Sequence, residues 1–502
     1  MSMSLRLSGA TFAFSPERVL LDDVDLHLTP GWTGLVGENG AGKSTLMRIL
    51  SGGLAPGLVR TEPADLPIVR VEQRIDRPSE RVQAFALAWD GDAVRLQSRL
   101  DLGFDALERW PTLSPGERRR WQVGAALWQR PGVLLLDEPD NHLDVEARTL
   151  LVQALAEFDG IGVLISHDRA LLDQLTSRTV RLHQGHLHVV DGPWSQAAEV
   201  WATEDDALRA QLEASKREVQ RQERKARVAD ASRSGAAGSR SMRGVDPRDH
   251  DARSSARKAR TAKAEQSHSK AAARMATEVE RARATHEGLD RPKDLGRDVF
   301  VDYEAPRRST LLTLQTPTLR PAPEADVLLY DVDVTVRRGA HVWLAGPNGA
   351  GKSTLVRALL SASSLPTERV FALPQELTEG EAAHLLEHLH ELAPDARGRV
   401  LQLVAALGVP PTNVLATSRP SPGEARKLAL ALGLFGTAWI LVLDEPTHHL
   451  DLPARERLER ALQAYPGALL LITHDRALGE AVCTERWRLH DRRVLLETIA
   501  VD

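Results

Sequence analysis

The sequence predicts an α/β protein in which two domains of the same fold, residues 4–198 and 308–502, are joined by an α-helical hairpin over residues 199–300. Three observations support this prediction. Long segments of the first half return in the second half. Within each half, a short apolar run, a glycine-rich turn and a helical pattern follow one another, as in a strand–loop–helix unit. Between the halves lies a helical pattern rich in Ala, Glu, Gln, Lys and Arg.

The repeat has the size of a domain. The stretch GLVGENGAGKSTLMRIL at Gly34 returns as WLAGPNGAGKSTLVRAL at Trp343, 309 residues later. LLLDEPDNHLD at Leu134 returns as LVLDEPTHHLD at Leu441, and LISHDRAL returns as LITHDRAL, both after 307 residues. Such a period indicates a duplicated domain and excludes a solenoid of short repeats. The apolar runs VLLLDEP and GVLISHD are typical of buried parallel strands.

Composition and charge exclude several classes of protein. The chain has 502 residues, 42% of them hydrophobic and 26% charged, which is typical of globular proteins. No apolar run approaches the ~18 residues of a membrane span, and the N-terminal MSMSLRLSGATFAF lacks the apolar core of a secretory signal. The single cysteine, Cys483, excludes an internal disulfide and a multi-cysteine metal site. We therefore expect a cytoplasmic protein with Cys483 in its core.

Each copy carries a glycine-rich loop that predicts phosphate binding. The pattern Gly-x-x-x-x-Gly-Lys-Ser occupies Gly37–Ser44 and again Gly346–Ser353. The glycines let backbone N–H groups surround a phosphate chain, and the following helix presents its positive end to the same anion. Lysine then reaches the β- and γ-phosphates, and the serine hydroxyl binds Mg²⁺. The predicted nucleotide-binding residues of these loops are Gly37, Asn39, Gly40, Gly42, Lys43, Ser44 and Thr45 in the first copy and Gly346, Asn348, Gly349, Gly351, Lys352, Ser353 and Thr354 in the second.

A pair of carboxylates ends an apolar run in each copy. The pairs are Asp137 with Glu138 and Asp444 with Glu445. Burying two carboxylates without a metal or a substrate would be costly. The pattern therefore favours an aspartate that holds the Mg²⁺ shell and a glutamate that polarises the attacking water as general base.

Two histidines and two helix starts complete the repeated set. His167 and His474 follow further apolar runs, and the ends of strands are where doubly wound sheets bind ligands, so we expect both to contact the γ-phosphate. The segments that begin at Ser114 and Ser421 read SPGE and open helical patterns. They predict a second positively charged helix start in each copy.

The order of these segments resembles the ATPase domain of the ABC superfamily. In both copies a phosphate loop, a glutamine, an SPGE segment, an Asp-Glu pair and a histidine follow one another. The resemblance implies that Gln73 and Gln375 contact the attacking water and the Mg²⁺ ion. It also implies an aromatic residue that stacks on adenine, for which the first copy offers Phe12 and Phe14 and the second copy offers none.

The resemblance further implies two ATP sites between the copies, each closed by the SPGE segment of the opposite copy. Asp144 and Asp451 would lie in loops that link the sites. The Mg²⁺ ligands would be Ser44, Gln73 and Asp137 in the first site and Ser353, Gln375 and Asp444 in the second. Site one would use Lys43, Ser44, Gln73, Asp137, Glu138 and His167, closed by Ser421 and Gly423, and site two would use Lys352, Ser353, Gln375, Asp444, Glu445 and His474, closed by Ser114 and Gly116.

The chain departs from the pattern of the superfamily at five positions. In the second copy, Pro420 replaces the usual leading Leu of the signature. Pro115 and Pro422 replace a small residue of the signature, and proline is tolerated at a helix start because its missing N–H was spare. Position 448 is His instead of Asn, and position 140 is Asp instead of Thr. Every expected ionisable group is present in both sets, so we predict two competent sites.

The spacer between the copies predicts two helices and a basic tip. Apolar side chains recur on one helical face from residue 198 to about 230 and again from about 254 to 287. Each helix of roughly 30 residues would be ~45 Å long, with the tip near residues 231–252. Residues 216–274 hold seventeen Lys or Arg and seven Asp or Glu, a net charge of +10 in a chain of net charge −5. Because this segment has no aromatic residue, it favours backbone and shape contacts with folded RNA.

Two ATPase domains joined by a helical basic linker resemble the ABC-F family. The resemblance implies an ATP-hydrolysing monomer, paired within its own chain, that binds the rRNA of the ribosome and places its linker near the P-site tRNA and the peptidyl-transferase centre. Members of the family are translation factors or antibiotic-resistance proteins that protect the ribosome. The short segment between Gln73 and Ser114 and the short C-terminal end favour the resistance branch. The alternatives are the tandem ATPase subunit of an ABC importer, which would dock on a membrane partner, and a DNA-associated ATPase.

Overall fold

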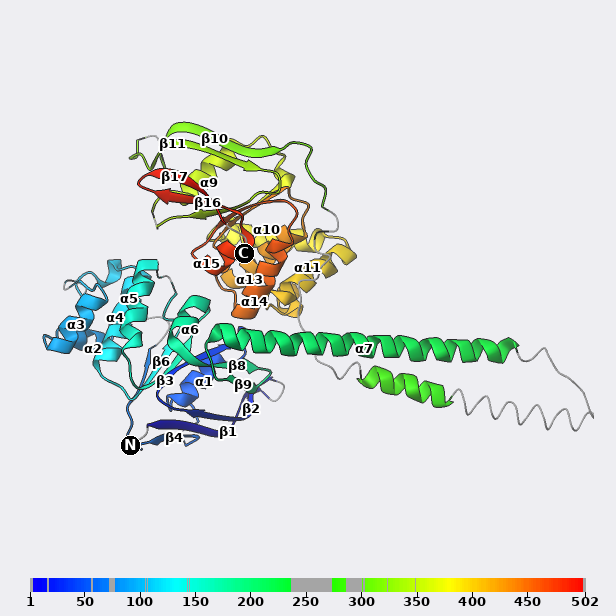
Figure 1. Cartoon of the computed structure of the whole chain (residues 1–502), viewed down its shortest axis with the longest axis horizontal. Helices are drawn as coiled ribbons and strands as arrows, with labels where there is room; N and C mark the ends of the chain where they lie inside the picture. Colours follow the sequence, from blue (N-terminus) through cyan, green and yellow to red (C-terminus); the bar gives the residue numbers. More distant parts are fainter. Residues whose placement is uncertain are drawn as a thin grey trace, which may run out of the picture. The chain divides into compact units, whose positions relative to one another are not determined.

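The computed structural model (Figure 1) describes most of the two copies and part of the linker. The residues it describes are 3–15, 18–55, 57–71, 77–103, 105, 107–141, 143, 145–235, 273–285, 300, 303–322, 324–347 and 349–499. The predictions for Gln73, Asp144 and Asn348, and for the tip after residue 235, lie outside these residues.

The first copy folds around a six-stranded sheet with the strand order β5-β6-β7-β3-β8-β9. All its strands are parallel except β9, which is antiparallel to β8. A second sheet has the order β2-β1-β4. The strands are β1 (Ser4–Ser15), β2 (Arg18–Leu28), β3 (Gly31–Gly37), β4 (Val59–Glu62), β5 (Ile68–Val71), β6 (Val133–Asp137), β7 (Ile161–Ile165), β8 (Thr176–His183) and β9 (His186–Val190). The helices are α1 (Lys43–Leu50), α2 (Glu80–Ala86), α3 (Gly91–Arg99), the 3₁₀ turn Trp110–Thr112, α4 (Pro115–Trp128), α5 (Val145–Ala156) and α6 (Arg169–Leu175).

The second copy repeats this topology with the order β13-β14-β15-β12-β16-β17 and a separate β10-β11 pair. The strands are β10 (Thr310–Leu319), β11 (Leu329–Arg337), β12 (His341–Ala345), β13 (Val370–Leu373), β14 (Ile440–Asp444), β15 (Ala468–Ile472), β16 (Glu485–His490) and β17 (Arg493–Thr498). The helices are α9 (Lys352–Ser361), the 3₁₀ turn Thr367–Arg369, α10 (Glu379–Glu391), α11 (Pro394–Ala406), α12 (Pro411–Ala416), α13 (Pro422–Phe435), α14 (Leu452–Gln463) and α15 (Arg476–Val482). The predicted pair of α/β domains in tandem is confirmed.

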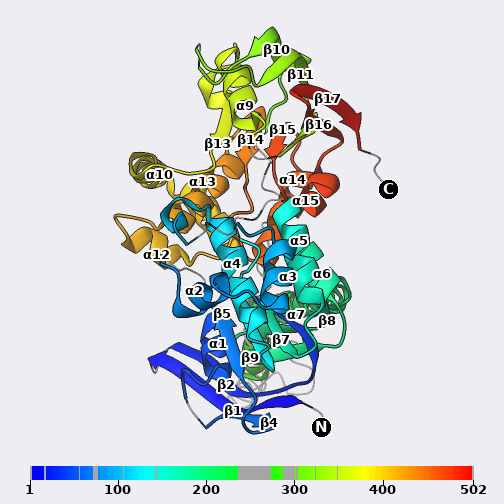
Figure 2. The same cartoon turned by 90° about the vertical axis from the view of Figure 1, so that its left-hand side faces the viewer.

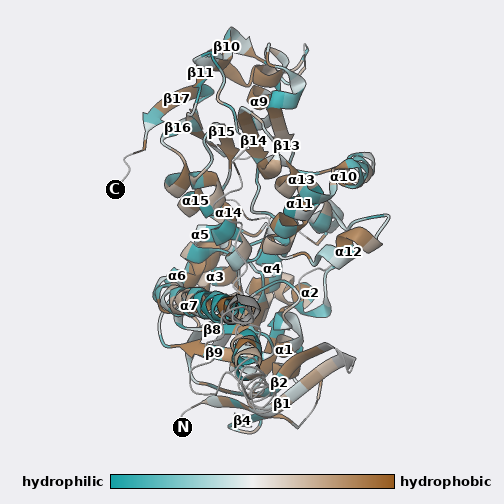
Figure 3. Cartoon of the chain, turned by 90° about the vertical axis from the view of Figure 1, so that its right-hand side faces the viewer, coloured by the Kyte–Doolittle hydropathy of each residue, from teal (hydrophilic) through white to brown (hydrophobic). Residues whose placement is uncertain are grey.

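Strands β7 and β15 are apolar along their whole length, as expected of strands in a parallel sheet that is covered on both faces. Every residue of β7 and β15 is buried, and Figure 3 shows β14 and β15 of the second copy as brown, hydrophobic ribbons. Helix α1 packs its apolar side between the central sheet and the β2-β1-β4 sheet (Figure 2). A separate apolar cluster, centred on Phe85, Trp110 and Trp121, joins α2 to α4. Cys483 is buried in the core of the second copy, as predicted.

The first linker helix is longer than the sequence predicted. Helix α7 runs over Trp194–Gly235, 42 residues, and therefore begins earlier and ends five residues beyond the expected end at residue 230. Its length is about 63 Å at 1.5 Å per residue. Residues 273–285 form a second helical segment, in which Arg283 pairs with Glu223 of α7 at 2.5 Å. This ion pair joins segments 60 residues apart, as the predicted hairpin requires.

The second copy takes in residues that the sequence analysis left to the linker or between the domains. The ring of Phe300 packs edge-on against Tyr465, with their centroids 5.2 Å apart, and Tyr303 contacts the same ring. The Trp439 indole N–H donates to the carbonyl of Glu304 at 2.9 Å. Aromatic packing and this hydrogen bond therefore extend the second copy toward residue 300.

The close approach of α15 to β12 gives a test of this packing. A Cβ on Gly479 would lie 2.5 Å from the Trp343 ring, whereas a Cβ on Gly380, in the first turn of α10, would meet open space. We expect Gly479→Ala to lower the free energy of unfolding of the second copy by about 2 kcal/mol through overpacking. Gly380→Ala, the control, should be neutral or slightly stabilising. Thermal unfolding of both variants measures this, and equal melting temperatures would contradict it.

Candidate nucleotide-binding sites

The two phosphate loops follow the central strands of the two sheets. The loop that begins at Gly37 leads from β3 to α1, and the loop that begins at Gly346 leads from β12 to α9. These glycines have φ of 148° and 156°. A Cβ on Gly37 would lie 2.4 Å from the carbonyl oxygen of Leu182, so only glycine permits this path. A loop without side chains at such positions fits the close approach of a phosphate chain to the backbone.

The loop lysines are held by main-chain carbonyls. Lys43 Nζ donates to the carbonyls of Gly37 and Glu38 at 2.8 and 3.0 Å. Lys352 makes the same two bonds in the second copy, at 2.7 and 3.0 Å. Burial lowers the pKa of Lys43, while nearby carboxylates, first among them Asp451, favour its charged form. Both ammonium groups are therefore positioned at the loop whose phosphate they are predicted to bind.

The predicted Mg²⁺ ligands come together at the ends of β6 and β14. Ser353 Oγ donates to Asp444 Oδ2 at 3.5 Å, and the Ser44 hydroxyl bonds Asp137. Burial raises the pKa of both aspartates, and the serine hydrogen bonds oppose the rise. A hydroxyl and a carboxylate at one point form the oxygen donor set that suits Mg²⁺. The first turns of α1 and α9 also contain Thr45 and Thr354.

Both predicted general bases have an unusual backbone conformation. Glu138 and Glu445 have φ of 49° and 48°, in the left-handed region that residues other than glycine rarely adopt. Their N–H groups donate to the carbonyls of Ile165 and Ile472, each at 2.8 Å. Such strain, repeated in both copies, is typical of functional positions, because the surrounding structure must hold it in place.

Two buried arginines, which the sequence analysis missed, hold the carbonyls of the carboxylate pairs. Arg119 of α4 donates from Nη2 to the carbonyls of Asp137 and Glu138 at 2.7 and 3.0 Å. Arg426 of α13 binds the matching pair, at 2.7 Å to the carbonyl of Glu445. The sequence did carry a signal, since both arginines stand two positions after the repeated SPGE. We call this arrangement the carbonyl clamp.

Glu138 lies in surroundings that favour its ionised form. His167 Nε2 is 3.3 Å from Glu138 Oε1, and Asn141 donates its amide to Oε2. Burial acts to raise the pKa of Glu138, but the hydrogen bond and charge of His167, the charge of Lys43 and the Asn141 bond lower it to about 2.

Glu445 lies in different surroundings although its neighbours match in position. His448 stands where the first copy has Asn141, and its Nε2 is 3.9 Å from Glu445 Oε2. His474 Nε2 is 3.7 Å from Oε1, although the His474 backbone N–H donates to Oε1 at 3.0 Å. Burial and the adjacent Asp444 raise the pKa of Glu445 to about 7. The two predicted bases therefore differ in charge near neutral pH.

The SPGE segments form capping boxes at the starts of α4 and α13. Ser114 accepts from the N–H of Glu117, whose carboxylate accepts from the Ser114 N–H, and Ser421 and Glu424 repeat the pair. The prolines occupy the first helical turn, as expected. The glutamates that follow the signature glycines therefore order the helix starts predicted to close the opposite sites.

Site one brings its phosphate loop against the second copy. The Asn39 N–H donates to Asp451 Oδ2 at 2.6 Å, and the Asn39 amide donates to the His449 carbonyl at 3.1 Å. A Cβ on the signature Gly423 would lie 3.5 Å from the Cβ of His449, which places Gly423 beside the same loop. Asp451 itself is fully buried and also caps α14.

Site two contains a cavity of about 580 Å³. Its lining includes nine predicted site residues of the second copy, namely Gly349, Gly351, Lys352, Ser353, Thr354, Gln375, Asp444, Glu445 and His474. The first copy contributes Asp140, Asn141, Leu143, Arg148, Asp168, Arg169 and Ala170. Among the described residues that line it, Ser114 and Gly116 are not found. The structure thus gathers the phosphate-binding half of site two without the predicted closing segment.

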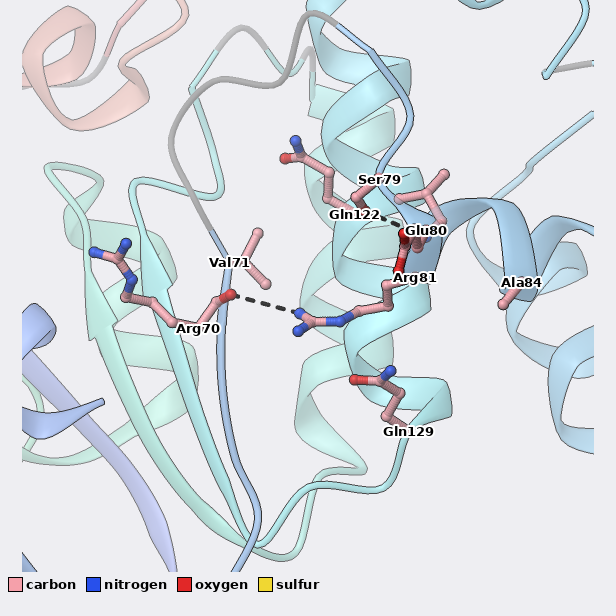
Figure 4. A pocket seen from close by; sticks show the side chains of 9 residues that line it. Arg70, Val71, Ser79, Glu80, Arg81, Ala84, Gln122 and Gln129 are labelled. Carbon is pink, nitrogen blue, oxygen red and sulfur yellow. Dashed lines mark hydrogen bonds between the residues drawn. The ribbon is translucent and has the colours of Figure 1, made fainter. Parts of the chain in front are cut away.

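Other predicted residues lie at the margin of the sites. Gln375 is exposed, and its main-chain carbonyl accepts from Arg426 Nη1 at 2.7 Å. Phe12 packs against the apolar core of the first copy, and the side chain of Phe14 is outside the described part of the structure. A further cavity of about 650 Å³ lies between β5, the start of α2, and α4 (Figure 4). There Arg81 Nη1 donates to the Arg70 carbonyl at 3.5 Å, close to the strand end that leads to Gln73.

Comparison with known families and structures defines the class. The ABC transporter family profile matches residues 21–141 and 329–448. A solved archaeal ribosome recycling factor, aABCE1, in complex with the ribosomal stalk protein aP1, superposes with a TM-score of 0.62 at 18% identity, over 98% of this chain and 90% of its own, a likeness of fold alone. Among the described residues, no helix combines the length and the apolar character needed to cross a bilayer. Fold and sites together define a tandem ABC ATPase.

Curated relatives narrow the class. The probable ATP-binding protein YheS of Escherichia coli is 30% identical over 95% of this chain and 77% of its own. The ribosome protection protein VmlR of Bacillus subtilis is 28% identical, over 88% and 79%. The energy-dependent translational throttle protein EttA of Mycobacterium tuberculosis is 28% identical, over 93% and 88%. The chain belongs to the ABC-F family of ATP-binding proteins.

The carbonyl clamp can be tested in the second copy. Arg426→Ala would leave buried carbonyls without donors, so we expect the free energy of unfolding to fall by about 3 kcal/mol. ATP affinity at site two should fall about tenfold, because the strand end carrying Asp444 loses its support. Thermal unfolding and titration with a fluorescent ATP analogue measure both quantities. Arg419→Ala, which removes an exposed guanidinium of the loop before α13, is the control and should change neither.

Proposed function

We propose that this protein is an ATP-hydrolysing factor that binds the ribosome, with ATP binding and hydrolysis at the two sites controlling its association through the linker. The linker, residues 199–300, would contact rRNA and the P-site tRNA near the peptidyl-transferase centre. Resistance to an antibiotic and regulation of translation both fit this role, since VmlR is named for ribosome protection and EttA for translational throttling. The protein would act as a cytoplasmic monomer.

The observation that carries the proposal is the charge distribution along α7. From residue 194 to 215 the helix holds one basic and five acidic residues, and from residue 216 to 235 it holds seven basic and three acidic residues. The second half is therefore suited to a phosphate backbone, while the first half is not. The ATPase subunit of an importer docks on a membrane protein and does not require a long helix with a basic end.

The sites supply what ATP hydrolysis requires of the protein. The glycine loops, Lys43 and Lys352 fit the phosphates of ATP, and the serine–aspartate pairs fit Mg²⁺, which when bound would neutralise phosphate charge. Glu138 and Glu445 would each orient a water molecule and accept its proton. His167 and His474 would contact the γ-phosphate. The second copy's contacts with Asn39 support the head-to-tail closure of site one on ATP.

Replacing both bases tests the link to the ribosome. The double variant Glu138→Gln, Glu445→Gln should bind ATP without hydrolysing it and so hold the closed state, because ATP biases the equilibrium through its contacts with that state. We expect it to sediment with ribosomes in ATP and to arrest translation in a cell-free system. Its absence from the ribosomal fractions would overturn the proposed function.

A control variant and two further observations distinguish the ribosome-binding hypothesis from the importer and the DNA-associated ATPase. The same variant with Lys216, Arg224 and Lys225 of α7 changed to Gln should bind ATP normally and lose ribosome association, most strongly at raised salt. Co-purification of the unmodified chain with an integral membrane subunit would instead indicate an importer. Stimulation of hydrolysis by duplex DNA would indicate a DNA-associated ATPase.

The two bases should give the two sites different pH profiles. Glu138→Gln leaves site two active, and its kcat/KM should fall about tenfold per pH unit below 7, because Glu445, with a pKa of about 7, then becomes protonated and cannot act as a base. Glu445→Gln leaves site one active, and its kcat/KM should show no loss from protonation of the base near pH 7, because Glu138, with a pKa of about 2, stays ionised. Phosphate release assays measure both profiles, and parallel curves would contradict the assignment.

A further inference from the structure

Helix α14 of the second copy makes charged contacts with the nucleotide site of the first copy. Arg457 Nη2 lies 3.5 Å from Glu38 Oε1, and Arg457 is 5% exposed at its side chain. Glu459 Oε2 accepts from Arg169 Nη1 at 2.8 Å. Arg455 Nη1 donates to the carbonyl of His167 at 2.8 Å. One turn and a half of helix therefore contacts the phosphate loop and the segment around His167 at once.

The internal repeat shows that site two cannot form these ion pairs. The residues at the matching positions are Leu150 for Arg457, Val152 for Glu459 and Pro347 for Glu38. None of these three side chains is charged, so no ion pair can form at the matching positions. Arg476, which matches Arg169, instead pairs with Glu480 of its own helix at 2.7 Å. The ion pairs of α14 thus belong to site one alone.

We propose that these two pairs, Arg457 with Glu38 and Glu459 with Arg169, form a latch that holds site one closed on nucleotide and makes it release nucleotide more slowly than site two. The inference rests on the proposed function only in taking both sites to bind ATP between the copies. Arg457 is a positioning residue, since it acts on the nucleotide through the phosphate loop.

The latch acts on the phosphate loop because the main chain of Glu38 also holds the side chain of Lys43. The Glu38 carbonyl accepts from Lys43 Nζ at 3.0 Å, and the neighbouring Asn39 is bound to Asp451 and His449. An ion pair to the Glu38 side chain therefore fixes the same peptide from a third direction. The Arg457 side chain is only 5% exposed, against 27% for Glu38, so solvent screens this ion pair less than a pair at the open surface.

Release of nucleotide from single-site proteins tests the latch. Full-length Lys352→Ala reports on site one and full-length Lys43→Ala reports on site two, each loaded with a fluorescent ATP analogue and chased with unlabelled ATP. Arg457→Leu, which introduces the residue of the first copy, should speed release from site one about fivefold. It should leave release from site two within about 1.5-fold, because no matching pair exists there.

Matched variants keep the test independent of folding. Arg457→Lys preserves the charge and should restore most of the slow release, whereas a merely structural defect would not be rescued. Arg460→Leu, on the exposed side of α14, should leave both rates unchanged. Equal acceleration at both sites, or no acceleration at site one, would overturn the latch. The measurement contains no ribosomes, so failure of ribosome binding would not affect its outcome.

Discussion

The architecture of each predicted ATP site depends on the carbonyl clamp. A chain that leaves a buried strand through a left-handed residue points two main-chain carbonyls into the protein, where they need donors. Arg119 and Arg426 supply these donors from the helices that begin with SPGE. The clamp therefore joins the carboxylates of one site to the helix start that is predicted to close the other. Movement of α4 or α13 would therefore displace the Asp-Glu pair of its own copy.

The two sites share this frame and differ in the groups placed around it. Asn141 and His448 stand at one matched position, and Glu38 and Pro347 at another. The two glutamates predicted to act as bases are the same residue on the same strained backbone, yet one has a low pKa and the other a raised pKa. Duplication has thus preserved the parts that hold the chain in place, while neighbouring charges have diverged. Inequivalence of the sites follows from these neighbours.

The sequence was sufficient to predict the order of the motifs, the duplicated fold and the two helix starts at SPGE, because these depend on local patterns that the repeat shows twice. The capping boxes were visible in Ser-x-x-Glu of SPGE, although they were not recognised. The positive φ of Glu138 could not be predicted, since it results from the surrounding packing. Nor could the contact of Asn39 with Asp451, which joins residues 412 positions apart. The end of α7 was misjudged because Ala231–Gly235 lies between a helical pattern and a glycine-rich one.

The uneven charge of α7 has a consequence for how the linker would approach the RNA that the proposed function requires. Acidic residues gather toward its beginning and basic residues toward its end, so the helix is an electric dipole with its positive pole at the end that leads to the tip. In the field of a nucleic acid such a dipole experiences a torque before any contact forms. The helix would approach with its basic end first, and its acidic beginning would be repelled. Orientation in solution would then precede recognition.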